Sequence, residues 1–325
     1  MQRWTLTSTN IQVSALGFGC VQLTSLSKKN AVAMLQHAFA EGITHFDTAR
    51  LYGFGRSEGI LAECLQGKRD QVTITTKFGF EFSLGAKNHR LITLTKKLLK
   101  PFPRLLRRAK KHASTMVKHG LFSKEAALTS LETSLRELKT DYIDFFLLHE
   151  ATMVDAANES LISTLEEQVH KGKIRYFGIA SDFAKYGHDI IMPSSYRILQ
   201  FNDDILQNNR QKLAGMTNQG IITHSVFKPA MLLYQAVTHD PNITKIFSHA
   251  LNLDLTNPQI LSKLILQYAV LKNKNGIVLF SSMNHDHITM NARTCEHDQL
   301  REDQSLLLSQ LINQHLPAFN SATSP

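Results

Sequence analysis

Four ionisable side chains stand at or just after points where short apolar segments of the sequence end. Asp47, Lys77 and His149 each close an apolar or β-branched run, and Tyr52 follows the first of these runs in a loop. Runs of this kind are typical of buried strands. In a barrel of parallel strands, residues at the carboxyl ends meet on one face, so we expect these four side chains to lie together.

The four residue types suit proton transfer to a carbonyl oxygen. The Tyr52 phenol is a weak acid, and the ammonium group of Lys77 is expected to lower its pKa. Asp47 would hold the charge on Lys77, and His149 would donate a hydrogen bond to a bound carbonyl oxygen. None of the four groups is a hydride source, so the reduction of a carbonyl would require a cofactor.

The elements that must position these residues alternate regularly between strand and helix. Eight strands are expected, at 16–19, 43–47, 72–77, 142–148, 174–179, 197–201, 220–226 and 276–280. Helical sequence is expected at 27–40, 57–66, 123–138, 159–171, 203–213 and 258–272. An irregular apolar region is expected after the seventh strand, and loops at 20–26, 80–122 and 226–250 are expected to line the substrate pocket. This alternation predicts an α/β fold, a (β/α)₈ TIM barrel.

Segments outside the repeating units have their own signatures. Two alternating runs around Ser8-Thr-Asn10 predict an N-terminal hairpin, and a helical tail is expected from about residue 299. Ser27 and Ser123 are expected to be helix N-caps. We see no repeat and no linker, so residues 1–325 are interpreted as one domain.

A basic insertion at about 85–122 carries the excess charge of the chain. The formal net charge is +9, yet the interval between Phe82 and Ser123 holds eleven Lys and Arg residues and no acid. Helical stretches are expected at 91–100 and 104–118. The insertion could be a solvated active-site loop, could attract anionic substrates or cofactor phosphates, or could touch acidic lipid or nucleic acid. Because it lacks interleaved aromatic residues beyond Phe102, we expect no nucleic-acid partner.

Cysteine usage and hydropathy favour a cytoplasmic protein. The three cysteines are far apart and form no disulfide framework, which is typical of a reducing compartment. No signal peptide and no membrane-spanning run is recognisable. The pair His285 and His287 has no third ligand at a suitable spacing, so no metal site is expected.

The motifs together resemble the aldo-keto reductase family, from Leu16 to about Asn291. They are His45-Phe-Asp-Thr-Ala-x-x-Tyr-Gly, Thr75-Thr-Lys77, Asp141-Tyr-Ile-Asp-x-x-x-Leu-His149 and Gly172-Lys-Ile-Arg-x-x-Gly-Ile. The resemblance implies a (β/α)₈ barrel that reduces carbonyls with NADP(H). It also implies a catalytic tetrad of Asp47, Tyr52, Lys77 and His149, with Tyr52 as the general acid.

The resemblance also implies cofactor contacts, some of which are altered in this chain. Gln200 and Ser181 match positions that hold the nicotinamide amide, and His224, followed by Ser225, replaces the usual aromatic ring on the nicotinamide. The positions around the adenosine phosphate are Ser281, Ser282, His287 and Asn291. Both cations that usually select the 2′-phosphate are absent, so NADP(H) is the family expectation while NAD(H) or dual use stays open.

The sequence therefore predicts an NAD(P)H-dependent carbonyl reductase or alcohol dehydrogenase that acts on a small-molecule carbonyl or alcohol. The alternative is a nucleotide-binding accessory or sensor protein on the same barrel, with little or no turnover. Substrate identity and oligomeric state stay open at this point.

Overall fold

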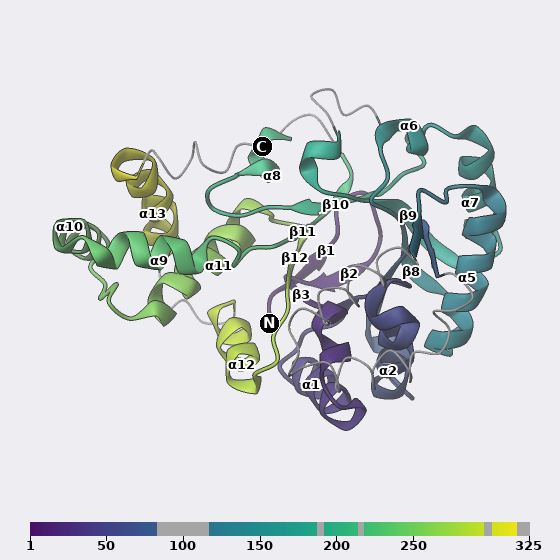
Figure 1. Ribbon diagram of the computed structural model, residues 1–325, viewed down its shortest axis with the longest axis horizontal. Coiled ribbons are helices and arrows are strands. Elements are labelled where there is room, and N and C mark those ends of the chain that lie inside the picture. Colours follow the sequence, from purple (N-terminus) through teal and green to yellow (C-terminus); the bar gives the residue numbers. More distant parts are fainter. Residues whose placement is uncertain (83–116, 187–191, 214–217, 296–300, 317–325) are drawn as a thin grey trace, which may run out of the picture.

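Eight parallel strands form a closed barrel in the computed structural model, which describes residues 1–82, 117–186, 192–213, 218–295 and 301–316 (Figure 1). The strands are β3 (Leu16–Gly19), β4 (His45–Asp47), β5 (Thr73–Phe78), β8 (Ile143–His149), β9 (Ile174–Ala180), β10 (Ile198–Asn202), β11 (Gly220–His224) and β12 (Ile277–Phe280). They follow one another around the barrel in chain order, and β12 pairs with β3 to close it. The predicted (β/α)₈ fold is confirmed.

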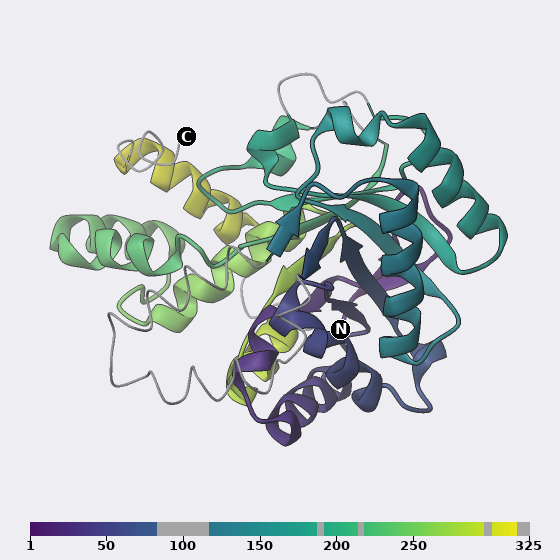
Figure 2. The same cartoon turned by 45° about the vertical axis from the view of Figure 1, so that its right-hand side comes forward.

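Helices surround this barrel. They are α1 (Lys28–Ala40), α2 (Arg56–Cys64), α5 (Lys124–Leu138), α6 (Met153–Ala156), α7 (Glu159–His170), α8 (Asn209–Lys212), α9 (Ala230–His239), α10 (Pro241–Leu251), α11 (Pro258–Lys272), α12 (His285–Thr294) and α13 (Glu302–His315). In two views, α9, α10 and α13 gather on the side of the barrel away from α5 and α7 (Figures 1 and 2). Within the described residues, no helix is long and apolar enough to cross a bilayer.

Two serines begin helices as expected. The Ser27 side chain accepts a hydrogen bond from the Asn30 amide at the start of α1, and Ser123 accepts one from Ala126 at the start of α5. These bonds satisfy amides that the first helical turn leaves without a backbone partner.

The predicted N-terminal hairpin closes one end of the barrel. Strands β1 (Arg3–Thr5) and β2 (Gln12–Ser14) pair antiparallel, and the Trp4 indole donates a hydrogen bond of 2.7 Å to the Gly276 carbonyl just before β12. Leu6 and Val13 of the hairpin pack against residues inside the barrel, among them Ile198 at the start of β10. The hairpin therefore covers the amino-terminal ends of the strands.

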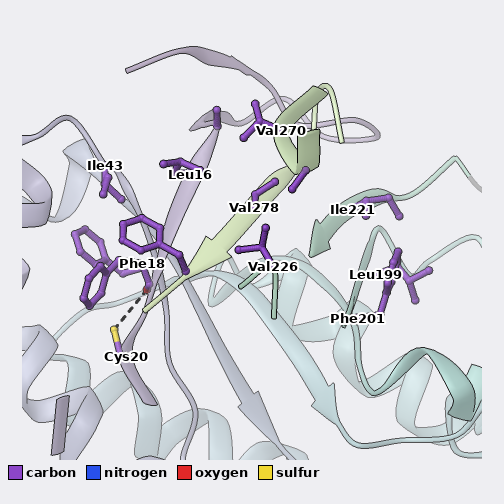
Figure 3. Packing of buried hydrophobic residues seen from close by; sticks show 14 of the residues in the cluster. Leu16, Phe18, Cys20, Ile43, Leu199, Phe201, Ile221, Val226, Val270 and Val278 are labelled. Carbon is purple, nitrogen blue, oxygen red and sulfur yellow. Dashed lines mark hydrogen bonds between the residues drawn. The ribbon is translucent and has the colours of Figure 1, made fainter. Parts of the chain in front are cut away.

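Alternation along the strands sorts the side chains into two sets. Leu16 and Phe18 of β3 point outward into the main core, which continues through Ile43 and, across the barrel, Leu199 and Phe201 (Figure 3). On each strand, the residues that alternate with these outward-pointing ones face the barrel interior, because successive side chains of a strand point to opposite sides. Asp47, Lys77 and His149 belong to this inward set and lie at strand carboxyl ends.

A second hairpin, which the sequence interpretation missed, borders the basic insertion. Strands β6 (Phe80–Phe82) and β7 (Val117–His119) pair antiparallel. Residues 117–119 therefore form a strand, although they lie inside the insertion expected at 85–122. The helices expected at 91–100 and 104–118 lie outside the described residues, apart from the last two positions.

The expected helix at 203–213 is wrong for most of its length. Only α8 (Asn209–Lys212) is helical there. The Asp204 side chain accepts hydrogen bonds from the amides of Leu206 and Gln207, which forms a turn in place of a helical start.

The irregular region expected between the seventh strand and the helix at 258–272 is also wrong, because α9 and α10 occupy most of it. Asp240 accepts a hydrogen bond of 2.8 Å from the Asn242 amide, and Pro241 occupies the first turn of α10. An acidic cap followed by proline is a helix-start signal that could have been recognised in the sequence. Between β9 and β10, the described residues contain only a short 3₁₀ turn at Phe183–Tyr186 and no longer helix.

Close packing between β9 and β10 yields a stability prediction. A Cβ atom on Gly178 would lie 2.0 Å from the carbonyl oxygen of Ile198, whereas one on Gly59 of α2 would meet only a Glu137 oxygen at 4.0 Å. Gly178→Ala should therefore lower the free energy of unfolding by about 3 kcal/mol. Gly59→Ala should raise it by up to about 1 kcal/mol, since alanine favours helices. Thermal unfolding measures both variants, and equal melting temperatures would contradict this packing.

Candidate active site

A cavity of about 410 Å³ opens at the carboxyl ends of the barrel strands. Nine of the twelve residues proposed from the sequence line it: Asp47, Tyr52, Lys77, His149, Ser181, Gln200, His224, Ser225 and Ser281. The four tetrad residues thus line one cavity, although they come from three strands and one loop.

A buried ion pair lies at the base of the site. The Lys77 ammonium donates hydrogen bonds to Asp47 Oδ1 at 2.6 Å and to the Thr48 carbonyl at 2.9 Å. The two charged residues are 2% and 3% exposed. Burial favours loss of the Lys77 proton, but the Asp47 carboxylate and Tyr52 outweigh burial and raise the pKa of Lys77 above its usual value of 10.5. Lys77 is therefore charged at neutral pH.

Tyr52 lies beside this pair, in the 3₁₀ turn Tyr52–Gly55 that follows β4. The Lys77 ammonium is 5.2 Å from the centroid of the Tyr52 ring, and side-chain hydrogen bonding to Lys77 favours the phenolate. Burial is the larger effect, however, so the pKa of Tyr52 is raised above 10.0. The sequence-based expectation of a lowered pKa is wrong for the protein without a ligand, because desolvation of the phenolate exceeds the attraction of one ammonium.

His149 presents a neutral imidazole to the cavity. Its ring lies edge-on to Tyr52 and to Phe80, with centroids 6.1 Å and 4.8 Å apart. Burial, followed by the charge of Lys77, holds the pKa of His149 well below 6.5. Its Nδ1 atom is buried and has no hydrogen-bond partner among the described residues. A neutral imidazole can donate one hydrogen bond to a ligand oxygen.

Gln200 reaches from β10 to the ion pair. Its amide nitrogen donates to Asp47 Oδ2 at 3.0 Å, so both carboxylate oxygens of Asp47 accept a hydrogen bond. The Gln200 Oε1 atom is buried and has no donor among the described residues. A buried acceptor of this kind requires a donor from water or from a ligand.

Ser181 and Tyr186 fix the end of β10 beside it. The Ser181 amide donates to the Gln200 carbonyl at 3.1 Å, and the Tyr186 hydroxyl donates to the same carbonyl at 2.7 Å. The Ser181 hydroxyl donates to the Ala151 carbonyl at 2.6 Å. Its oxygen still has the capacity to accept a hydrogen bond from a ligand.

The end of β11 forms another wall of the cavity. His224 Nδ1 and the Ser225 hydroxyl share a hydrogen bond of 2.9 Å, and burial lowers the pKa of His224. Ser225 has φ of +70°, a conformation that non-glycine residues adopt mainly at sites where the surrounding structure enforces it.

Three residues proposed as cofactor contacts do not line this cavity. Ser282 bonds to the backbone of Asn284 at the start of α12, His287 is exposed on α12, and Asn291 is buried on the same helix. Ser281 does line the cavity, and its hydroxyl donates to the Gly19 carbonyl at 2.8 Å.

Two charged residues that were not proposed as site residues also line the cavity, one of them, Lys228, in the loop expected there at 226–250. Glu150 directly follows His149, has φ of +62° and forms an ion pair with Lys185. Lys228 is exposed, three positions beyond Ser225, and has no carboxylate partner among the described residues. Their adjacency to predicted site residues was the available signal.

Comparison with known proteins identifies relatives over most of the sequence. The model of the Aldo/keto reductase family matches residues 15–313. "Uncharacterized oxidoreductase YqkF" of Bacillus subtilis (strain 168) is 30% identical over 184 residues, which are 56% of this chain and 49% of that protein. "Probable aldo-keto reductase 1" of Glycine max is 29% identical over 175 residues, 52% of this chain and 42% of that protein. The chain thus spans about half the length of the curated relatives it matches.

Solved structures share the fold over nearly the whole chain. The holo form of aldo-keto reductase AKR11C1 from Bacillus halodurans has a TM-score of 0.70 at 21% identity, covering 96% of each chain. An aldo-keto reductase from Klebsiella pneumoniae in complex with NADPH has a TM-score of 0.64 at 18% identity, covering 97% of this chain and 96% of that one. The match to the family model, together with the closed barrel, shows that this chain belongs to the Aldo/keto reductase family.

Proposed function

We propose that this protein is an NADP(H)-dependent oxidoreductase that reduces a small-molecule aldehyde or ketone, or oxidises the corresponding alcohol. The observation that carries the proposal is the buried Asp47–Lys77 pair, with Tyr52 and His149 lining the same cavity. A structural ion pair would not require a phenol and a neutral imidazole beside it. The four groups together suit proton transfer to a carbonyl oxygen.

The residues present fit a nicotinamide cofactor. Gln200 Oε1 is a buried acceptor without a donor, and the carboxamide NH₂ of a nicotinamide is a donor of suitable size. Gln200 and Ser181 would hold that amide, while His224 and Ser225 would border the ring. When bound, the reduced cofactor supplies the hydride.

The side chains of this chain would then control the oxygen of the substrate. The neutral imidazole of His149 donates a hydrogen bond that orients and polarises the carbonyl. The Tyr52 hydroxyl, which is protonated at neutral pH, donates its proton to the same oxygen as charge develops there. Lys77 stabilises the phenolate that remains, and Asp47 keeps Lys77 charged and in place.

NADP(H) is the cofactor we favour, because similar structures from Klebsiella pneumoniae were solved in complex with NADPH and with NADP. The residues on α12 bring no Lys or Arg to the cavity. Lys228 is a cation at its mouth, and we assign it a cofactor phosphate as partner.

We also propose one domain over residues 1–325 and a cytoplasmic location. All three cysteines are buried and free, which suits a reducing compartment.

Absorbance measurements test the function directly. When the protein is mixed with NADPH and a panel of aldehydes and ketones, the absorbance of NADPH should fall as the cofactor is oxidised. Tight NADPH binding without any turnover across the panel would instead favour an accessory or sensor protein on this barrel.

Removing the phenol hydroxyl should abolish most of the turnover. Tyr52→Phe should lower kcat by about 10³-fold because the proton donor is lost, while the Kd for NADPH changes by less than about twofold. Tyr176→Phe is the matched control, since the Tyr176 hydroxyl bonds to Asn10 at the opposite end of the barrel. Comparable losses in the two variants would contradict the assignment of Tyr52.

The pH dependence of carbonyl reduction follows from the two pKa directions. The pKa of His149 lies well below 6.5 and that of Tyr52 lies above 10.0, so at neutral pH the imidazole is neutral and the phenol is protonated. Because the protonated phenol is the active form, kcat should be flat between about pH 6 and pH 9 and should fall as pH rises through the pKa of Tyr52. An inflection near the usual histidine pKa would argue against a neutral His149.

Lys228→Met tests the proposed phosphate contact. The Kd values for NADPH and NADH should both rise by about tenfold, because a charge-assisted hydrogen bond to the shared diphosphate is lost. Lys245→Met is the control, since Lys245 is also exposed but lies on α10 and does not line the cavity. Unchanged affinity for both cofactors would exclude this role.

A further inference from the structure

A second buried ion pair lies next to the site without lining the cavity. The Glu58 carboxylate, in the first turn of α2, is fully buried, and its Oε2 accepts a hydrogen bond of 2.6 Å from Arg50 Nη1. Arg50 stands two positions before Tyr52 in the loop that follows β4. The exposed fraction of the Arg50 side chain is 19%, so this pair is largely shielded from water.

The other oxygen of Glu58 connects the loop to the strand of Lys77. Glu58 Oε1 accepts a hydrogen bond of 2.7 Å from the Thr76 hydroxyl, and Thr76 precedes Lys77 on β5. One carboxylate therefore holds the loop that carries Tyr52 and the strand that carries Lys77. Removing either bond would leave buried polar atoms without partners.

The neighbouring residue of Glu58 adds a third connection. The Ser57 hydroxyl accepts a hydrogen bond of 3.0 Å from Thr48, which follows Asp47, and donates one of 3.3 Å to the Cys20 carbonyl. The first turn of α2 is thus bonded to residues adjacent to Asp47 and Lys77 and to Arg50 near Tyr52.

The loop between these anchors has an unfavourable backbone conformation. Gly53, Phe54 and Gly55 have φ values of +58°, +60° and +84° in succession. Phe54 is costly in this conformation, and such strain persists only where the surrounding structure imposes it. The Arg50 guanidinium lies against Gly55, 3.3 Å from the position a Cβ atom would take there. Arg50 thus packs on the strained turn itself.

We propose that Arg50 and Glu58 are positioning residues that hold the Tyr52 hydroxyl beside the Lys77 ammonium. This inference rests on the proposed role of Tyr52 as the proton donor. Without the pair, the turn at 52–55 relaxes and the phenol loses its alignment with Lys77, although neither Arg50 nor Glu58 contacts the cavity. A displacement of about 1 Å at a reacting group is enough to cost about a hundredfold in rate.

The chain contains a matched control for this pair. Arg69 Nη2 donates a hydrogen bond of 2.7 Å to Asp144 Oδ2, and the exposed fractions of the two side chains are 18% and 0%. Asp144 also accepts a hydrogen bond from the Ile74 amide, near the start of β5. The Arg69–Asp144 pair therefore lies toward the amino-terminal ends of the strands. Both pairs join a largely shielded arginine to a fully buried carboxylate, and Asp144 also pairs with Arg175 at 3.0 Å. Only the Arg50–Glu58 pair adjoins the turn that carries Tyr52.

The experiment compares Arg50→Met with Arg69→Met in the full-length protein, below the unfolding transition of each variant. Arg50→Met should lower kcat by at least about tenfold with the Kd for NADPH unchanged, whereas Arg69→Met should leave kcat within about twofold. Arg50→Lys, which keeps the charge, should recover part of the loss. If Arg50→Met does not fold, the double variant Arg50→Met/Glu58→Gln removes both buried charges and takes its place.

Hydrogen–deuterium exchange provides a readout that does not depend on turnover. Amides at 48–55 should exchange faster in Arg50→Met than in the unaltered protein, and at an unchanged rate in Arg69→Met. Equal kcat in the Arg50 and Arg69 variants, or unchanged exchange at 48–55, would overturn the inference. A protein that exchanges as expected but reduces no carbonyl would refute the proposed function while leaving the structural role of the pair intact.

Discussion

The contact between the Lys77 ammonium and the Asp47 carboxylate is the interaction on which the site depends. Two charges that are almost fully buried lose most of their hydration, and only a well-placed partner together with further hydrogen bonds compensates for that loss. Here the Thr48 carbonyl and the Gln200 amide provide those bonds. Loss of one partner from such a pair typically costs about 3–5 kcal/mol, so the surrounding strands must hold both groups. Because these bonds offset the desolvation of the pair, Lys77 stays charged next to Tyr52.

The barrel separates this charged end from an apolar one. Hairpin β1–β2 and the inward-facing residues near it form an apolar core at the amino-terminal ends of the strands, with Leu6 and Val13 fully buried. Charged and polar inward-facing residues, including Asp47, Lys77 and Gln200, lie toward the carboxyl ends, where the cavity opens. The strained turn at 52–55 lies at this carboxyl-terminal end, where the bonds of Arg50 and Glu58 hold it in place.

Strand positions and the convergence of the tetrad could be predicted from the sequence, because alternation and strand-end placement are local signals with a geometric consequence. The turn at 203–208 could not, since it depends on the Asp204 side chain competing with helical hydrogen bonds. The pKa of Tyr52 was predicted in the wrong direction because burial, which no local pattern reports, outweighs a recognisable charge partner. Glu150 and Lys228 were not proposed as site residues because their residue types match solvated charges, and only their adjacency to His149 and Ser225 pointed to the cavity. Ser282, His287 and Asn291 were assigned through resemblance alone, and they lie outside the cavity that holds the tetrad.

A crystal structure of the protein with bound NADP⁺ tests the central claim most directly. We expect the nicotinamide carboxamide nitrogen within hydrogen-bonding distance of Gln200 Oε1 and the ring beside the Tyr52 hydroxyl, with Lys77 still bonded to Asp47. A nicotinamide bound away from Gln200, or a Lys77 side chain separated from both Asp47 and Tyr52, would contradict the account.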